Sequence, residues 1–248
     1  MQPLATIMPL LAEAPWVEVE FSVTGLVVLG VLCGYGLMVE PWLGVRFFKG
    51  FRRASLDPAQ QRWPWFAGLI GMQVLALLVI GGLVWQWPEL TTNSIGLRWG
   101  NLQSPIVLGI LGGAIATFIW TSILLIRSPD EADMPLIGDT AFLVPRTPQE
   151  RLWVGAIALG AGTSEELLYR GLLPALVVGV GVPVAVAATI QAALFGLAHR
   201  YQGWQGVGYT ALLGLLLGIL VVSTGSLLVP IFLHVMIDLR LVLMSQNL

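Results

Sequence analysis

The sequence predicts an all-α membrane protein, a polytopic bundle of about seven transmembrane helices, and two observations carry this prediction. Charged residues make up only 10% of the 248 residues, less than half of the roughly 25% found in a soluble globular domain. Hydrophobic residues make up 56%, and the mean hydropathy is +0.84. The chain therefore has too few polar side chains to cover a surface that faces water.

Three apolar segments in the first half are each long enough to cross a bilayer. A spanning helix needs about 20 mostly apolar residues, because nothing in the hydrocarbon except the helix itself satisfies the backbone. Residues 21–39, 65–87 and 105–126 meet this requirement, and charged, Pro or aromatic residues bound each of them. The stretch 1–20 is acidic and has no basic n-region, so we interpret it as an extramembrane or interfacial arm and not as a signal peptide.

Four further spans are expected in the second half, where ionisable residues interrupt the apolar runs. A long helix over 149–178 is expected to kink at Pro174. The turn sequence 179–183 then precedes a helix that reaches about His199. The last two spans cover 204–223 and 226–245. We divide the chain into the arm (1–20), a part with three transmembrane helices and polar loops (21–146) and a core of four transmembrane helices (147–248).

Basic residues in the short loops predict the orientation of the bundle. Five of them crowd the loop after the first span, whereas the N-terminal arm has none: Arg46, Lys49, Arg52, Arg53 and Arg62. This loop is therefore expected on the cytoplasmic side of the plasma membrane. Alternation of the spans then places the N-terminus outside and the C-terminus inside.

Charge and residue counts exclude several classes of function. The 12 basic and 14 acidic residues nearly cancel, so the chain lacks the basic excess that nucleic-acid binding needs. The single Cys33 excludes an internal disulfide framework and a cysteine-rich metal site. With only two histidines, His199 and His234, a multi-histidine metal cluster is excluded as well. No Ser lies in a GxSxG setting, so a covalent Ser mechanism has no support.

Four ionisable residues lie inside the predicted spans: Glu165, Glu166, Arg170 and Asp238. Each charge at mid-bilayer costs roughly 2.5 to 3.5 kcal/mol on insertion scales, so these groups must be paired, protonated or solvated by a cavity. Arg170 follows Glu166 by four residues, on the same helix face, which predicts an ion pair. Ionising the adjacent Glu165 as well is unfavourable in a low dielectric, so one carboxyl is suited to general acid or base catalysis.

Helix geometry brings both histidines to these acids. At 1.5 Å per residue, Glu166 and His199 lie roughly 22 and 27 Å from the turn at 179–183, which puts them at similar depths on antiparallel neighbours. His234 and Asp238 are four residues apart on one face of the last span. The groups are thus expected to converge in the inner half of the bundle, open to the cytoplasm. Buried carboxylates and imidazoles beside a water path are suited to hydrolysis.

Three motifs occur in order on successive spans: EExxxR from Glu165 to Arg170, FxxxH from Phe195 to His199, and Hxxx(N/D) from His234 to Asp238. In these motifs the chain resembles the CPBP, or Abi, family of intramembrane proteases, which includes the type II CAAX prenyl endopeptidases. The resemblance covers about residues 147–245. It implies an all-helical membrane fold and peptide-bond hydrolysis without a covalent intermediate.

The resemblance also implies a role for each motif residue. Glu165 would activate the water with His199, His234 and Asp238 would form the oxyanion site, and Glu166 and Arg170 would support them. Asp238 departs from the Asn of the prenyl endopeptidases. An ionised Asp cannot donate a hydrogen bond to an oxyanion, so Asp238 must be protonated, orient His234 or ligate a metal.

Family members are described both as metalloproteases and as glutamate proteases, which raises the question of a metal cofactor. A Zn²⁺ ion could in principle be held by two histidines and two acids: Glu165, His199, His234 and Asp238. HExxH spacing is absent, however, and the ligands would come from three separate helices. We therefore favour a metal-free mechanism.

The sequence leaves three hypotheses about function. The first, which we favour, is an intramembrane endopeptidase that acts from the cytoplasmic side on a peptide or protein held in the bilayer, with or without a lipid group. The second is a transporter or proton relay, because intramembrane acids and histidines also mark ion pathways, but the sequence shows no inverted repeat. The third is a non-catalytic membrane scaffold or immunity-type protein, against which the intact motif set argues.

Overall fold

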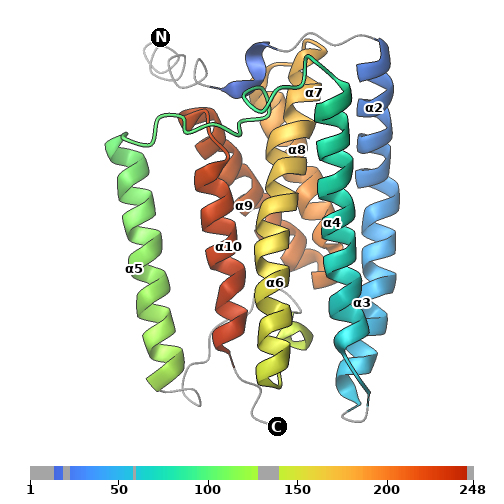
Figure 1. The fold of residues 1–248 in the computed structure, drawn as a ribbon, viewed down its shortest axis with the longest axis vertical. Coiled ribbons are helices and arrows are strands. Elements are labelled where there is room, and N and C mark those ends of the chain that lie inside the picture. The colour runs from blue at the N-terminus through green and yellow to red at the C-terminus, as the bar shows by residue number, and fades with distance from the viewer. Residues whose placement is uncertain (1–13, 19–22, 58–59, 128–139, 245–248) are drawn as a thin grey trace.

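A computed structural model of the chain describes residues 14–18, 23–57, 60–127 and 140–244. These residues form helices joined by turns and loops, and no strand occurs among them. Figure 1 shows the helices running side by side along the long axis of the molecule. The predicted fold class, an all-α bundle, is confirmed. Of the predicted N-terminal arm, only residues 14–18 are described.

The first helical rod is longer than the predicted span at 21–39. It runs through α2 (Val23–Gly34), the π-helical η2 (Tyr35–Val39) and α3 (Glu40–Leu56). The prediction of a loop directly after residue 39 is therefore wrong. Pro41 lies in the first turn of α3, and the wide π turn before it lets the helix continue past a residue that lacks a backbone N–H.

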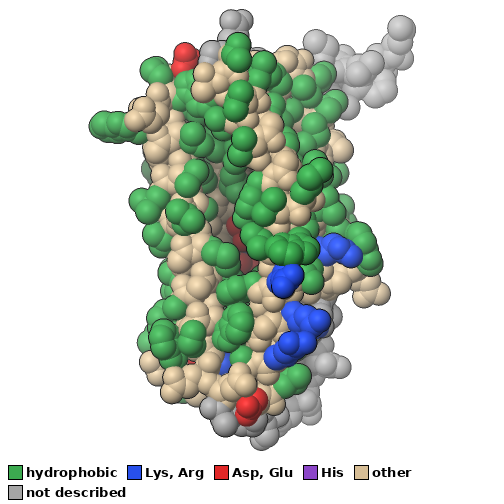
Figure 2. Space-filling view, turned by 90° about the vertical axis from the view of Figure 1, so that its right-hand side faces the viewer, with side chains coloured by type: hydrophobic (Ala, Val, Ile, Leu, Met, Phe, Trp, Pro, Cys, Tyr) green, Lys and Arg blue, Asp and Glu red, His purple; other side chains and the backbone are tan. Residues whose placement is uncertain are grey.

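Four of the five basic residues that were expected in this loop lie instead on α3: Arg46, Lys49, Arg52 and Arg53. The fifth, Arg62, directly precedes α4. Figure 2 shows apolar side chains over most of one face of the bundle and Lys and Arg side chains gathered toward its lower end. Basic residues therefore mark one end of the bundle, although they do so from a helix.

The next helices follow the predicted spans closely. They are α4 (Trp63–Gln86) and α5 (Pro105–Arg127). A second interrupted rod consists of α6 (Pro148–Glu165), the π-helical η4 (Glu166–Leu172) and α7 (Leu173–Gly179). The irregularity expected at Pro174 takes the form of this π segment, which ends just before the proline.

The last part of the chain folds back on itself twice. It contains α8 (Val184–Ala198), the 3₁₀ turn η5 (His199–Gln202), α9 (Gly203–Thr224) and α10 (Leu228–Leu243). The chain reverses at Gly203, whose φ of 82° suits glycine, and α9 packs along α8. The second reversal uses Gly225, with a φ of 67°.

Four segments of the described residues are long and apolar enough to cross a membrane: Val23–Leu56, Trp63–Gln86, Val107–Leu124 and Val184–Thr224. Large apolar side chains such as Val27, Leu78 and Trp120 are 60, 68 and 65% exposed on the outside of the bundle. Exposed apolar surface on this scale suits contact with lipid. The count of seven spans stays a prediction.

Apolar side chains form separate clusters toward the two ends of the bundle. One cluster joins Trp16, Ile95 and Leu227 to the apolar face of α7. Another joins Phe51, Phe66, Phe142 and Val154 at the end where α3, α4 and α6 meet. Helix α6 contacts α4 on one side and α10 on the other. The predicted site residues lie between these clusters.

Candidate active site

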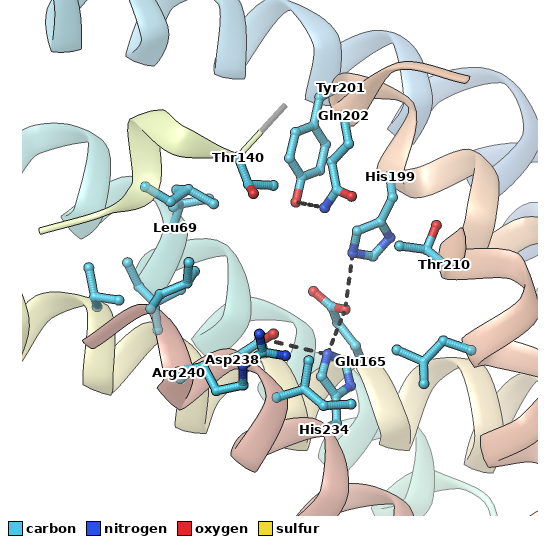
Figure 3. A pocket seen from close by; sticks show the side chains of 18 of the residues that line it. Leu69, Thr140, Glu165, His199, Tyr201, Gln202, Thr210, His234, Asp238 and Arg240 are labelled. Carbon is cyan, nitrogen blue, oxygen red and sulfur yellow. Dashed lines mark hydrogen bonds and ion pairs between the residues drawn. The ribbon is translucent and has the colours of Figure 1, made fainter. Parts of the chain in front are cut away.

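A cavity of about 190 Å³ opens among α3, α4, α6, α9, α10 and the segment that begins at Thr140. Four of the six predicted site residues line it: Glu165, His199, His234 and Asp238. The other two, Glu166 and Arg170, are fully buried at 0% exposure. The structure thus brings side chains from three separate helical segments to one place (Figure 3).

Glu165, the last residue of α6, faces both imidazoles. Its Oε2 lies 3.8 Å from His199 Nε2 and 3.9 Å from His234 Nε2. These distances are too long for direct hydrogen bonds. The same buried oxygen has no hydrogen-bond partner among the described residues. Glu165 therefore directs a carboxylate oxygen that accepts no hydrogen bond from the described residues toward two ring nitrogens.

A backbone contact sets the tautomer of His199. Its Nδ1 lies 2.9 Å from the carbonyl oxygen of Phe195, one turn earlier. A carbonyl only accepts hydrogen bonds, so Nδ1 carries the proton, and in the neutral ring the lone pair is on Nε2. The ring centroids of Phe195 and His199 are 4.6 Å apart. The FxxxH spacing thus aims an acceptor nitrogen at Glu165.

Glu166 and Arg170 form the predicted i to i+4 ion pair. Arg170 Nη1 lies 2.9 Å from Glu166 Oε1, with both side chains out of contact with solvent. The guanidinium carbon also lies 3.8 Å from the centroid of the Phe195 ring, in a cation–π arrangement. The guanidinium offsets the cost of burying the Glu166 carboxylate, and the Phe195 ring favours the buried guanidinium.

The same carboxylate oxygen has a second partner that the sequence did not predict. His234 Nδ1 donates to Glu166 Oε1 at 2.7 Å, across 68 residues of sequence. Adjacent helix positions point about 100° apart, so Glu165 faces the cavity while Glu166 points toward α10. The buried ion pair therefore orients the ring of His234.

Asp238 lies at the edge of this arrangement. Its Oδ2 is 3.7 Å from His234 Nε2, one helical turn away, and 32% of its side chain is exposed. Carboxyl groups thus face both nitrogens of the His234 ring. In the ionised form Asp238 can only accept hydrogen bonds.

A Zn²⁺ ion would need several donor atoms around one point. Among the residues that the structure describes, no group of three or more His, Cys, Asp and Glu side chains is placed to hold a metal. His234 Nδ1 donates to Glu166, which leaves Nε2 as the nitrogen that faces Glu165 and Asp238. The preference for a metal-free mechanism, over a Zn²⁺ ion held by Glu165, His199, His234 and Asp238, stays a prediction.

Several residues around the site were not predicted from the sequence. Tyr201 and Gln202 line the cavity directly after His199, and nearness to that motif is a signal that could have found them. In addition, the hydroxyl of Tyr169 donates a hydrogen bond to Glu40, which connects α3 to the π segment η4. A carboxylate at the end of an apolar run, such as Glu40, is itself a signal of a buried partner.

Part of the chain is similar to a known protein family. Residues 147–240 match the family model described as "Type II CAAX prenyl endopeptidase Rce1-like". No curated protein and no solved structure matches the chain. The matched region runs from the start of α6 to Arg240 in α10 and contains all six predicted site residues. Within this integral membrane protein, residues 147–240 are therefore similar to the Rce1-like type II CAAX prenyl endopeptidases, a family of proteases.

Proposed function

We propose that the protein is an intramembrane endopeptidase that hydrolyses a peptide bond of a membrane-associated peptide or protein with a water molecule activated by Glu165 and His199. One observation carries this proposal. Glu165 Oε2 has no hydrogen-bond partner in the described structure and faces the Nε2 atoms of His199 and His234 at 3.8 and 3.9 Å, in a cavity.

The gap between Glu165 and His199 suits a water molecule. A water at about 2.8 Å from both Glu165 Oε2 and His199 Nε2 would make a hydrogen bond with each. Glu165 takes one proton as the water oxygen attacks the scissile carbonyl carbon, and His199 accepts a hydrogen bond from the other O–H. The protonated Glu165 then gives its proton to the leaving amine nitrogen as the C–N bond breaks.

The remaining motif residues hold this geometry and stabilise the negative charge that develops on the oxygen of the scissile carbonyl. Arg170 and Glu166 fix the His234 ring through the bonds at 2.9 and 2.7 Å. Because Nδ1 donates to Glu166, His234 can donate to an oxyanion only through a protonated Nε2. Asp238, 3.7 Å from Nε2, favours that protonated ring by its charge.

A neighbouring apolar cavity supports a substrate that carries a lipid chain. This second cavity, about 510 Å³ in volume, lies among α5, α9 and α10. It shares Leu213, Ile237 and Arg240 with the catalytic cavity, and its other lining residues are apolar except for two threonines. A hydrocarbon chain placed there would hold the attached peptide next to Glu165.

We further infer that the catalytic cavity opens to the cytoplasm at the plasma membrane. Support comes from the residues at its wall, since Phe48 of α3 and Met244 beyond α10 both line it. These residues lie toward the end of the bundle that carries the basic residues of α3. Basic residues concentrate on the cytoplasmic side of membrane proteins.

The test uses the purified protein in lipid vesicles with a prenylated peptide that ends in a CAAX sequence. Peptides from cells with the wild-type protein and with Glu165→Gln are compared in parallel to find natural substrates. Glu165→Gln and His199→Ala are each expected to reduce cleavage by about 100-fold or more, because each removes a group that handles the water proton. Glu89→Gln changes an exposed acid outside the cavity and serves as the matched control.

Two results would contradict the proposal. Cleavage that survives in both Glu165→Gln and His199→Ala, with both variants folded, would remove these residues from the chemistry. Cleavage that stops when a chelator removes bound metal, and returns when Zn²⁺ is added, would overturn water activation by Glu165 and His199 alone. We expect cleavage to be unchanged by the chelator.

A further inference from the structure

Tyr201 brings to the catalytic cavity a hydroxyl group that none of the three motifs includes. It lies two residues after His199 in the turn η5 and lines the cavity together with Glu165, His234 and Asp238. Figure 3 shows the hydroxyl end of its ring turned toward the space that Glu165 and His199 border.

Two aromatic rings neighbour the ring of Tyr201. The Phe48 ring of α3 stacks on it, with 3.7 Å between centroids and 18° between planes. The His199 ring is a second aromatic neighbour, with 5.7 Å between the two centroids. An aromatic ring packed in this way has little rotational freedom, so the direction of its hydroxyl group is preset.

The hydroxyl proton of Tyr201 is available to a ligand. Gln202 Nε2 donates a hydrogen bond to the phenol oxygen at 3.1 Å, so the oxygen acts as the acceptor in that contact. In the described part of the chain, Tyr201 donates no hydrogen bond of its own. A hydroxyl that accepts one hydrogen bond becomes a stronger donor in the next.

The proposed reaction needs such a donor, and the inference rests on that proposed function. The tetrahedral intermediate carries a negative oxygen that neutral or cationic donors stabilise. Ionised Asp238 can only accept hydrogen bonds, whereas an Asn at this position would donate through its amide. His234 supplies one donor at most on this side, because its Nδ1 is bound to Glu166.

We propose that Tyr201 is a catalytic residue whose hydroxyl donates a hydrogen bond to the oxyanion of the scissile carbonyl, in place of the amide donor that Asp238 lacks. The phenol keeps its proton throughout, so no bond to hydrogen breaks at Tyr201. Phe48 and Gln202 act as positioning residues for this hydroxyl.

The first experiment measures kcat and KM of Tyr201→Phe in lipid vesicles with the prenylated CAAX peptide as the probe. This substitution keeps the ring stacked on Phe48 and removes only the oxygen. Loss of one oxyanion donor reduces kcat by about 100-fold, and KM should stay within about twofold because the bond forms only as the transition state is reached. Tyr209→Phe changes a tyrosine that is 59% exposed on α9 and serves as the matched control.

The second experiment repeats the comparison in an Asp238→Asn background. If the Asn amide supplies the missing donor, removing the Tyr201 hydroxyl there should reduce kcat by only about tenfold or less, since two groups that serve one atom are not additive. Gln202→Met, which leaves the phenol in place without its orienting amide, should reduce kcat by an intermediate factor.

Three outcomes would overturn the inference: Tyr201→Phe with at least half of the wild-type kcat, a defect confined to KM, or the same loss of kcat in the Asp238→Asn background. They are distinguishable from failure of the proposed function. If Glu165→Gln is inactive while Tyr201→Phe is fully active, the endopeptidase stands and only the role of Tyr201 is wrong. If Glu165→Gln and His199→Ala are both active, the proposed function itself fails.

Discussion

Removing the guanidinium of Arg170 tests the central electrostatic feature of the site. Arg170 and Glu166 are both 0% exposed and lie 2.9 Å apart. In Arg170→Met the Glu166 carboxylate keeps one donor among the described residues, His234 Nδ1 at 2.7 Å. Breaking a buried pair by removing one partner costs about 3 to 5 kcal/mol of the free energy of unfolding, because the other charge is left uncompensated. The contact of the guanidinium with the Phe195 ring, at 3.8 Å, is lost as well.

The measurement is the stability of the purified variants in detergent, by thermal and chemical unfolding. The double variant Glu166→Gln plus Arg170→Met removes both charges, so it should regain at least half of the stability that Arg170→Met loses. Arg53→Met, which changes an exposed arginine of α3, is the control and should be neutral. The reasoning is refuted if Arg170→Met loses less than about 1 kcal/mol, or if the double variant is less stable than Arg170→Met.

Two further predictions concern the packing around the site. Arg62 is buried and donates to the carbonyl oxygens of Phe142 and Val144 and to Glu150. Arg62→Met should therefore lower the free energy of unfolding by about 3 kcal/mol. Chemical unfolding that is unchanged in this variant would disprove the prediction. A Cβ at Gly162 would lie 2.9 Å from the backbone nitrogen of Val235. Gly162→Ala must therefore push α6 away from α10 and reduce kcat. Gly155→Ala is the control, because its nearest contact would be at 3.9 Å, and it should leave kcat unchanged. Equal kcat in these two variants would contradict the close packing.

The positions of most helices could be predicted from the sequence because crossing a bilayer imposes a local requirement. A run of about 20 apolar residues needs a helix to satisfy its backbone, whatever its neighbours are. The bounds of α4 and α5 agree with the predicted spans to within two residues. The first span was predicted too short because charge was taken to end it. The π turn before Pro41 carries the helix through, and no composition rule indicates such a turn.

Contacts within one helix could also be predicted. The spacing of four between Glu166 and Arg170 places them on one helix face, and the ion pair is present at 2.9 Å. The same holds for His234 and Asp238, one turn apart at 3.7 Å. Periodicity alone is enough for such pairs, since helix geometry is the same in every context.

By itself, the sequence determined the fold class, the approximate spans, the order of the three motifs and the set of ionisable groups that lie among apolar residues. Only the tertiary structure decided which partner each of these groups faces. It directed Glu165 to the cavity and Glu166 to His234, 68 residues away. It also placed Tyr201, whose ring stacks on that of Phe48, at the wall of the same cavity. The physical reason is that a contact between distant segments depends on which helices pack together and at what rotation, and the hydrophobic pattern of a helix that is apolar on all sides does not specify that rotation.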